Sequence, residues 1–278
     1  EFHQRESGVA LNYVKLRENG QVDLFHLEAL LQQHPGSLVT LMHANNETGN
    51  VTDIDTVGHL CRQYGAFFHS DTVQTLGHFS FDLRRQPVDM LVGSAHKFHG
   101  PKGIGLLYLN RRLRLKPLLH GGAQEKSLRA GTENVAGIVG LAKALEIAVR
   151  DRAAHQRHLL QLKHSLVHRL KQMVGDITFN GDCLSPEGGH PAIVNVSLPA
   201  SVVGGLLSQL DAAGIAASGG SACSRAGGSH VLRQLGVDLS RDNVRFSLSK
   251  YNTLPEITYL TDTVARLLVP ERALQRAG

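Results

Sequence analysis

The chain has 278 residues, of which 42% are hydrophobic and 19% charged, and its formal net charge is +5 with neutral histidines. This length is enough for one large or two modest domains, and the composition is typical of a globular protein. No apolar run approaches the roughly 20 residues of a membrane span, and no basic segment followed by an apolar one opens the chain, so we expect neither a membrane protein nor a secretory leader. The basic residues are scattered, so no direct nucleic-acid partner is expected.

In the first half of the chain, short apolar runs alternate with a helical pattern. Strands are predicted over residues 37–44, 66–71, 88–95 and 103–109. Residues 53–65 have apolar side chains at helical spacing, an aspartate near the start and Gly65 as a stop signal, so they are predicted to form a helix. Strand, helix and strand in this order predict an α/β layer with a mainly parallel sheet.

The second half of the chain has a different pattern. Residues 134–173 contain no proline and carry a helical periodicity longer than most single helices. We expect them to connect two domains. Strands are then predicted near 192–198 and 243–249, and helices near 202–213, 230–235 and 255–268. The sequence therefore predicts a large domain over 1–150 and a smaller α+β domain over 151–278.

The chain contains three cysteines, Cys61, Cys183 and Cys223, and no CxxC motif. An odd number of cysteines at these spacings disfavours both a disulfide framework and a metal site, and it favours a reducing, cytoplasmic location. Cys61 belongs to a helical pattern and is expected in the core. Cys223 stands in "SGGSACSRAGG", where the glycines and serines indicate an accessible loop.

Polar residues follow three of the predicted strands. Asn45 and Asn46 come after the first, Asp71 ends the second with Gln74 one turn later, and "SAHK" (Ser94, His96 and Lys97) follows the third. In an open parallel sheet, ligands bind outside the carboxyl ends of the strands. We therefore expect one crevice to collect amides, a carboxylate, a hydroxyl, an imidazole and an amine.

This set of groups suits pyridoxal 5'-phosphate. The cofactor's aldehyde needs a lysine, for which Lys97 is the candidate, and its ring nitrogen needs a carboxylate so that the ring acts as an electron sink. Asn46 or Gln74 could donate to the ring oxygen, and Ser94 with His96 could bind the phosphate. Each of these residues alone is more often structural, since a strand-end aspartate commonly caps a helix and an Asn-Asn-Glu sequence commonly forms a turn.

Five motifs together resemble one family, the cysteine desulfurases of the NifS/IscS type. They are "MHANNETG", "HSDTVQTLG", "SAHKFHGPKGIGLLYL", "HGGAQEKSLRAGTENVAGIVG" and "SGGSACS". The family belongs to the class V aminotransferases, and the resemblance covers essentially the whole chain. It implies the fold-type I pyridoxal-phosphate transferase architecture and conversion of L-cysteine to L-alanine.

The resemblance also implies a role for each matching residue. Lys97 matches the Schiff-base lysine, Asp71 the partner of the pyridinium, and Gln74 the donor to the ring hydroxyl oxygen. Asn46 matches a substrate-side amide, and Ser94 and His96 match phosphate contacts. Thr132 matches a threonine that reaches the phosphate in the partner subunit, which implies a homodimer.

The resemblance assigns the second half of the reaction to Cys223 and Arg245. Cys223 matches the thiol that receives sulfur as a persulfide, for later transfer to acceptors such as an iron–sulfur scaffold or a tRNA-thiolation protein. Arg245 matches the arginine that holds the substrate carboxylate, for which a planar guanidinium is well suited.

The sequence leaves alternatives open. The family's first hundred or so residues, with a phosphate-cradling turn and a ring-stacking histidine, have no match in this sequence, so we expect weak cofactor binding by the chain alone. The alternatives are a non-catalytic interaction module and a selenocysteine lyase of the same fold. An aminotransferase is disfavoured by the thiol of the "SACS" loop.

Overall fold

The computed structural model describes residues 6–200, 205–219 and 229–268. Its first sheet contains β1 (Leu38–Met42), β2 (Phe67–Asp71), β3 (Met90–Ser94) and β4 (Gly105–Leu109), in the order β1-β2-β3-β4. β1, β2 and β3 run parallel, and β4 runs antiparallel to β3. The predicted α/β layer with a mainly parallel sheet is therefore confirmed.

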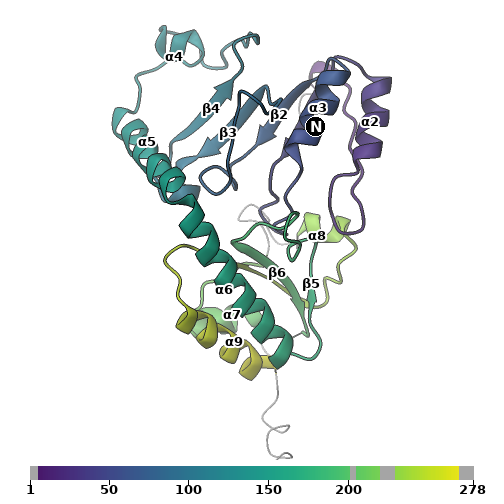
Figure 1. The fold of residues 1–278 in the computed structure, drawn as a ribbon, viewed down its shortest axis with the longest axis vertical. Helices are drawn as coiled ribbons and strands as arrows, with labels where there is room; N and C mark the ends of the chain where they lie inside the picture. Colours follow the sequence, from purple (N-terminus) through teal and green to yellow (C-terminus); the bar gives the residue numbers. More distant parts are fainter. Residues whose placement is uncertain (1–5, 201–204, 220–228, 269–278) are drawn as a thin grey trace, which may run out of the picture.

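Two helices cover one face of this sheet (Figure 1). They are α2 (Leu24–Gln33) and α3 (Ile54–Gln63), and each begins at an aspartate, Asp23 or Asp53, whose carboxylate accepts hydrogen bonds from backbone N–H groups of the first turn. Their apolar residues pack against the inward-facing residues of the strands. The buried cluster is Leu27, Leu31, Val39, Ile54, Val57, Cys61, Ala66, Phe68, Val88 and Leu91. Cys61 belongs to this core, as predicted.

The opposite face of the first sheet carries exposed apolar side chains. Leu38 pairs in register with Phe67, and Met42 with Asp71. Leu38, Met42, Phe67 and Leu107 are 58%, 44%, 42% and 51% exposed. Because side chains alternate between the two faces of a strand, these residues share the face turned away from the α2 and α3 cluster.

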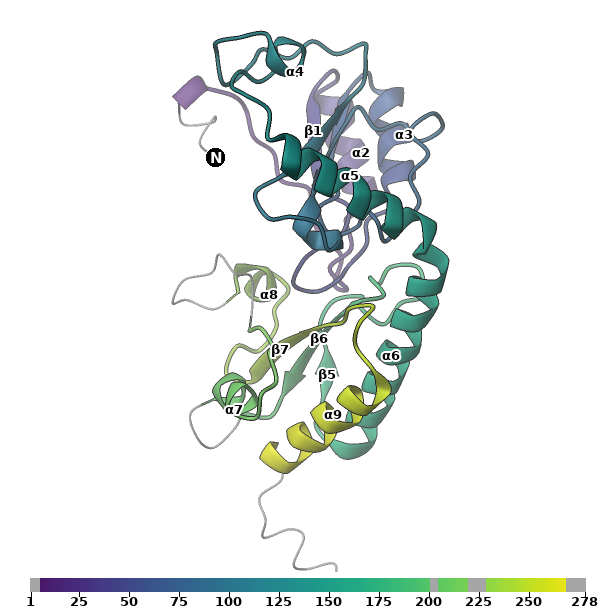
Figure 2. The same ribbon diagram turned by 90° about the vertical axis from the view of Figure 1, so that its left-hand side faces the viewer.

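Two consecutive helices connect the first sheet to the second (Figures 1 and 2). They are α5 (Val135–Arg150) and α6 (Arg152–Met173). The helical periodicity predicted over 134–173 is therefore confirmed, and it is divided at Asp151, which ends α5 and precedes α6 with a ψ of 6°. The Arg150 guanidinium binds the Asp151 carboxylate at this break. The preceding loop contains the single turn α4 (Gln124–Ser127).

The second sheet is antiparallel and has the order β5-β6-β7. Its strands are β5 (Thr178–Phe179), β6 (Ile193–Leu198) and β7 (Asp242–Ser247), so the strand predicted over 243–249 ends two residues early. α6, α7 (Leu206–Ala212) and α9 (Leu254–Leu268) supply the rest of its core, and α8 (His230–Gln234) lies beside it. None of the described helices is long and apolar enough to cross a membrane.

Candidate active site

The polar residues predicted at strand ends occupy one edge of the first sheet. Asn45 and Asn46 follow β1, Asp71 is the last residue of β2, and Ser94 is the last residue of β3. Since these three strands are parallel, their carboxyl ends meet at this edge. The predicted juxtaposition of the three segments is therefore present.

A short 3-10 turn, η1 (Ala95–Phe98), carries Lys97 away from the end of β3. His99 ends the turn in the left-handed conformation with φ 67°, which is uncommon for a residue with a side chain. The backbone thus changes direction at His99, two residues after Lys97. Ser94 Oγ and His96 Nδ1 are hydrogen-bonded at 2.8 Å on the same turn.

A cavity of about 230 Å³ lies between this edge and the second sheet. It is lined by Asn46, Gln74, His78, Lys97, His190, Ala192, Ile193, Arg245, Ser247 and Leu248. The fold thus brings together four of the predicted site residues, Asn46, Gln74, Lys97 and Arg245, which are spread over 200 positions of the sequence. An amine, a guanidinium and two amides therefore face one small space.

Lys97 has no hydrogen-bond or ion-pair partner for its amine among the described residues. Partial burial lowers the pKa of Lys97, and the positive charge of Arg245 lowers it further. A lowered pKa increases the neutral fraction of an amine, which is the form that acts as a nucleophile or a base. The surroundings of Lys97 therefore favour reactivity.

Arg245 reaches the cavity from the middle of β7. Its Nη1 donates to the carbonyl oxygen of Asn46 at 2.7 Å, while its Nε is buried and has no partner among the described residues. Burial lowers the pKa of Arg245, and the charge of Glu47 opposes this by raising it. The guanidinium is thus held at the cavity wall with unused hydrogen-bonding capacity, which an anionic ligand could take up.

Two histidines that the sequence interpretation did not single out also line the cavity. His190 is 2% exposed, and its Nδ1 accepts from the backbone N–H of Ala192. Its Nε2 therefore carries the proton and donates to the carbonyl oxygen of Gln74 at 2.9 Å. Burial lowers the pKa of His190 to about 3, and burial also lowers the pKa of the adjacent His78. Both imidazoles are neutral at pH 7. No motif in the sequence marks these two histidines as site residues, so they are found only from their positions in the structure.

The remaining predicted residues lie outside the cavity lining. Asp71 is exposed, and its Oδ1 accepts from the backbone N–H of Val73 at 2.9 Å. Ser94 ends β3, His96 lies on η1 beside Lys97, and Thr132 is exposed in the loop before α5. Cys223 lies outside the described residues. Of the other two cysteines, Cys183 is 0% and Cys61 1% exposed.

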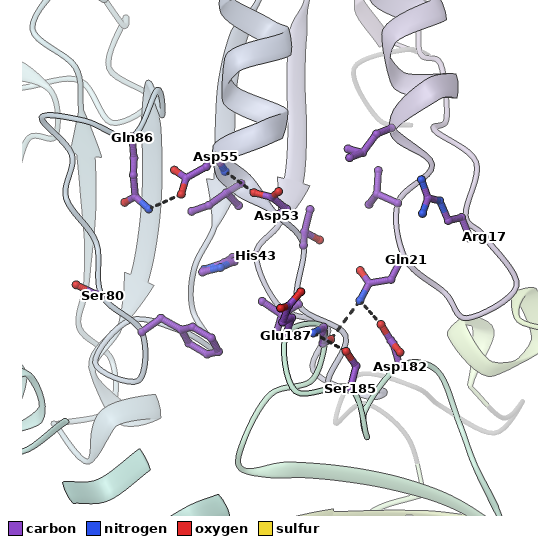
Figure 3. Close-up of a pocket in the computed structure, with 17 residues that line it drawn as sticks. Arg17, Gln21, His43, Asp53, Asp55, Ser80, Gln86, Asp182, Ser185 and Glu187 are labelled. Atoms are coloured by element: carbon purple, nitrogen blue, oxygen red, sulfur yellow. Dashed lines mark hydrogen bonds between the residues drawn. The ribbon is translucent and has the colours of Figure 1, made fainter. Parts of the chain in front are cut away.

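A larger cavity of about 580 Å³ lies elsewhere and contains none of the predicted site residues (Figure 3). Its wall carries several carboxylates, most of which bind other groups of the protein. Asp53 caps α3, Asp182 accepts from Gln21 at 3.0 Å, and Asp55 lies 3.5 Å from the Gln86 amide. Four of the predicted site residues line the smaller cavity instead.

Comparisons with known proteins agree with this geometry. The class V aminotransferase family matches residues 2–260. A cysteine desulfurase IscS of Dictyoglomus turgidum is 35% identical over 272 residues, which cover 96% of this chain and 68% of that protein. A cysteine desulfurase of a Nostoc species is 38% identical over 271 residues, with coverage of 96% and 67%.

Solved structures give the same result. A NifS-like protein superposes with a TM-score of 0.84 at 35% identity, covering 96% of this chain and 70% of that one. A NifS-like protein from Rickettsia africae has a TM-score of 0.84 at 28% identity, with coverage of 96% and 72%. The chain spans about two thirds of the length of the relatives it matches.

Proposed function

This chain belongs to the class V aminotransferase family, among its cysteine desulfurases, and on that premise we propose that it releases sulfur from L-cysteine with the help of pyridoxal 5'-phosphate. The observation that carries the proposal is the convergence of Lys97, Arg245, Asn46 and Gln74 on one cavity. The alternative of a non-catalytic interaction module gives no reason why an amine without a partner among the described residues should share a cavity with the Arg245 guanidinium, whose Nε also lacks one there.

The residues around the cavity fit this cofactor. The Lys97 amine has no partner among the described residues and a lowered pKa, as a group that bonds to an aldehyde requires. Asp71 would hold the protonated ring nitrogen, and Gln74 would donate to the ring hydroxyl oxygen. The hydrogen-bonded pair of Ser94 and His96 would bind the phosphate. When bound, pyridoxal phosphate supplies an electron sink for the bonds at the substrate's α-carbon.

The protein's own groups then perform the sulfur transfer. Arg245 binds the substrate carboxylate, and Lys97 moves protons at the substrate carbons. The Cys223 thiolate attacks the substrate sulfur, so that an S–S bond forms on the enzyme as the substrate's C–S bond breaks. The carbon keeps the electron pair and takes a proton. The products are alanine and a persulfide on Cys223, and no external oxidant or reductant is needed.

Several finer assignments belong to the same proposal. The chain divides into a cofactor domain over 1–150 and a smaller domain over 151–278, with the division at the Asp151 break. The enzyme is a cytoplasmic homodimer in which Thr132 contacts the phosphate of the partner subunit. The persulfide passes to a sulfur-acceptor protein such as an iron–sulfur scaffold. Exposure of Thr132 on the loop before α5 is consistent with a contact between subunits.

The test is release of alanine and sulfide from L-cysteine with added cofactor and a thiol reductant. It should be run on this chain and on a longer version extended before Glu1 by the additional segment of a relative. Equal molar amounts of the two products, dependent on the cofactor, would support the proposal. A selenocysteine lyase would instead release selenide from selenocysteine and leave L-cysteine unchanged, and an interaction module would release nothing in either version.

A further inference from the structure

Two buried polar atoms near the smaller cavity have no hydrogen-bond partner in the part of the chain that the structure describes. One is Oε2 of Glu47, whose side chain is among the largest that are fully buried, with 1% exposure. The other is Nε of Arg245. A buried carboxylate with a free oxygen is costly, so its presence needs a physical reason.

Glu47 is held against β6 and β7, the strand pair that contains Arg245. Arg245 and Asn195 are register partners across β7 and β6. The guanidinium of Arg245 donates to the carbonyl oxygen of Asn46 at 2.7 Å, and the amide of Asn195 donates to the carbonyl oxygen of Glu47 at 2.9 Å. The Asn46-Glu47 turn is therefore attached to the second sheet at two adjacent points.

The turn itself fixes where Glu47 lies. Asn45 Oδ1 accepts hydrogen bonds from the backbone N–H groups of Glu47 and Thr48. Gly49 closes the turn with φ +76°, and a Cβ at this position would lie 3.0 Å from the side chain of Ile193. Glu47 thus has little freedom to turn its carboxylate toward solvent.

Glu47 acts on Arg245 through its charge. They form no ion pair, yet the negative charge of Glu47 raises the pKa of Arg245 against the effect of burial. A negative charge that forms no hydrogen bond with the guanidinium stabilises its positive charge and leaves its N–H groups available to a ligand. A direct bidentate salt bridge would instead occupy the edge that a ligand needs.

We propose that Glu47 is a positioning residue for Arg245, and that it holds the guanidinium ready for a substrate carrying a free carboxylate. The proposal rests on the proposed function for the identity of the substrate. The negative charge of Glu47 opposes the cost of burying the guanidinium, so Arg245 keeps its charge and its bond to the Asn46 carbonyl oxygen before a ligand binds. Glu47 touches neither substrate nor cofactor in this scheme.

The decisive variant is Glu47→Gln, which removes the charge and keeps the shape, with exposed Glu18→Gln as the matched control for the change in net charge. We expect KM for L-cysteine to rise about tenfold, with kcat changed less than twofold, because orientation of the substrate-binding arginine is lost and the reacting groups are not. Turnover of cysteamine, which has no carboxylate, should be equal in parent and variant. An unchanged or lower KM for cysteine, or an equal loss with both substrates, would refute the positioning role.

A measurement on the cofactor-free chain separates this inference from the proposed function. The NMR resonance of the Arg245 Nε–H group is assigned through its loss in Arg245→Lys, and it is followed during titration with L-alanine as the carboxylate probe. We expect slow exchange with water and a shift on titration in the parent and in Glu18→Gln, and fast exchange with a weaker shift in Glu47→Gln.

If the parent released no alanine from cysteine, the proposed function would fail while this NMR signature could still be present. If the Arg245 resonance were the same in parent and Glu47→Gln, the positioning role would fail by itself.

Discussion

Arg245 and Asn46 are 199 positions apart in the sequence, and the guanidinium of one donates to the carbonyl oxygen of the other at 2.7 Å. This bond joins the second sheet to the turn that follows β1. It places the arginine at the same cavity as Lys97, which comes from the end of β3. The site is therefore assembled from both sheets, and neither sheet contains it alone.

The attachment between the sheets should contribute measurably to stability. Asn195→Ala removes the donor to the Glu47 carbonyl oxygen and also the acceptor for the Asn180 amide, and both groups are buried. The Asn180 amide keeps Asn243 Oδ1 as an acceptor, so we expect the free energy of unfolding to fall by about 1–3 kcal/mol, the cost of leaving the buried Glu47 carbonyl oxygen without its donor. Urea unfolding measures this, with exposed Asn12→Ala as the control. A loss in Asn195→Ala no larger than that of the control would show that the attachment does not stabilise the fold.

Lys97 should be distinguishable from its neighbour Lys102, which is exposed in the following turn. Lys97→Ala should abolish the yellow absorbance of bound cofactor and lower turnover at least about a hundredfold, because it removes both the covalent attachment and the proton carrier. Lys102→Ala should leave absorbance and turnover at parent values. Parent-like turnover in Lys97→Ala would exclude the assigned role.

The sequence was sufficient to predict the layers and the edge of the first sheet where the polar residues gather. Alternating apolar runs and caps such as Asp53 are local signals, and the fold follows from them. His190 carries no such signal, because it stands in a loop and lines the cavity only through contacts with residues distant in the sequence, such as Gln74. Glu47 stands in a turn motif, and its burial against β6 is seen only in the structure. The break at Asp151 likewise has no signal in the sequence, since helical periodicity continues on both sides of it.

Transferred sulfur should be found on Cys223 and not on the other cysteines. Cys61 and Cys183 are 1% and 0% exposed. Burial raises the pKa of Cys61 to about 12 and raises that of Cys183 as well, so neither forms a thiolate at neutral pH. Peptide mass spectrometry after addition of cysteine should show one extra sulfur on the Cys223 peptide and none on the peptides of Cys61 and Cys183, which serve as internal controls. Cys223→Ser should bind cofactor normally and retain no sulfur, and extra sulfur on Cys61 or Cys183 would overturn the assignment.

The exposed apolar face of the first sheet should make the chain prone to association. Phe67 and Leu107 are 42% and 51% exposed on this face. The double variant Phe67→Lys, Leu107→Lys should reduce binding of a hydrophobic dye and light scattering, while the free energy of unfolding changes by no more than about 1 kcal/mol. Phe68→Ala, at a position that is 0% exposed on the other face, should instead cost about 3–5 kcal/mol. Unchanged dye binding in the double variant would mean that the face does not cause the association.

Stability should fall in mild acid because His43 is buried in its neutral form. The ring is 6% exposed, and its Nδ1 is hydrogen-bonded to Thr75 Oγ1 at 2.8 Å. Burial lowers the pKa of His43 from 6.5 to about 4, although Asp53 opposes the shift. The unfolded chain therefore binds a proton below pH 6.5 that the folded chain does not bind until about pH 4. This histidine alone removes up to about 3 kcal/mol from the free energy of unfolding as the pH falls through that interval.

A variant that cannot titrate isolates this contribution from that of His190, whose pKa is also lowered by burial. His43→Asn should be less stable than the parent at pH 7.5, because it loses ring packing against Phe79 and Phe81. Between pH 6.5 and pH 4, the free energy of unfolding of His43→Asn should nevertheless fall by about 3 kcal/mol less than that of the parent. The reason is that the unfolded variant no longer takes up a proton at this position. Exposed His34→Asn should keep the parent's dependence on pH. Urea unfolding at half-unit steps of pH provides the comparison, and parallel curves for the parent and His43→Asn would show that the acid sensitivity arises at other groups.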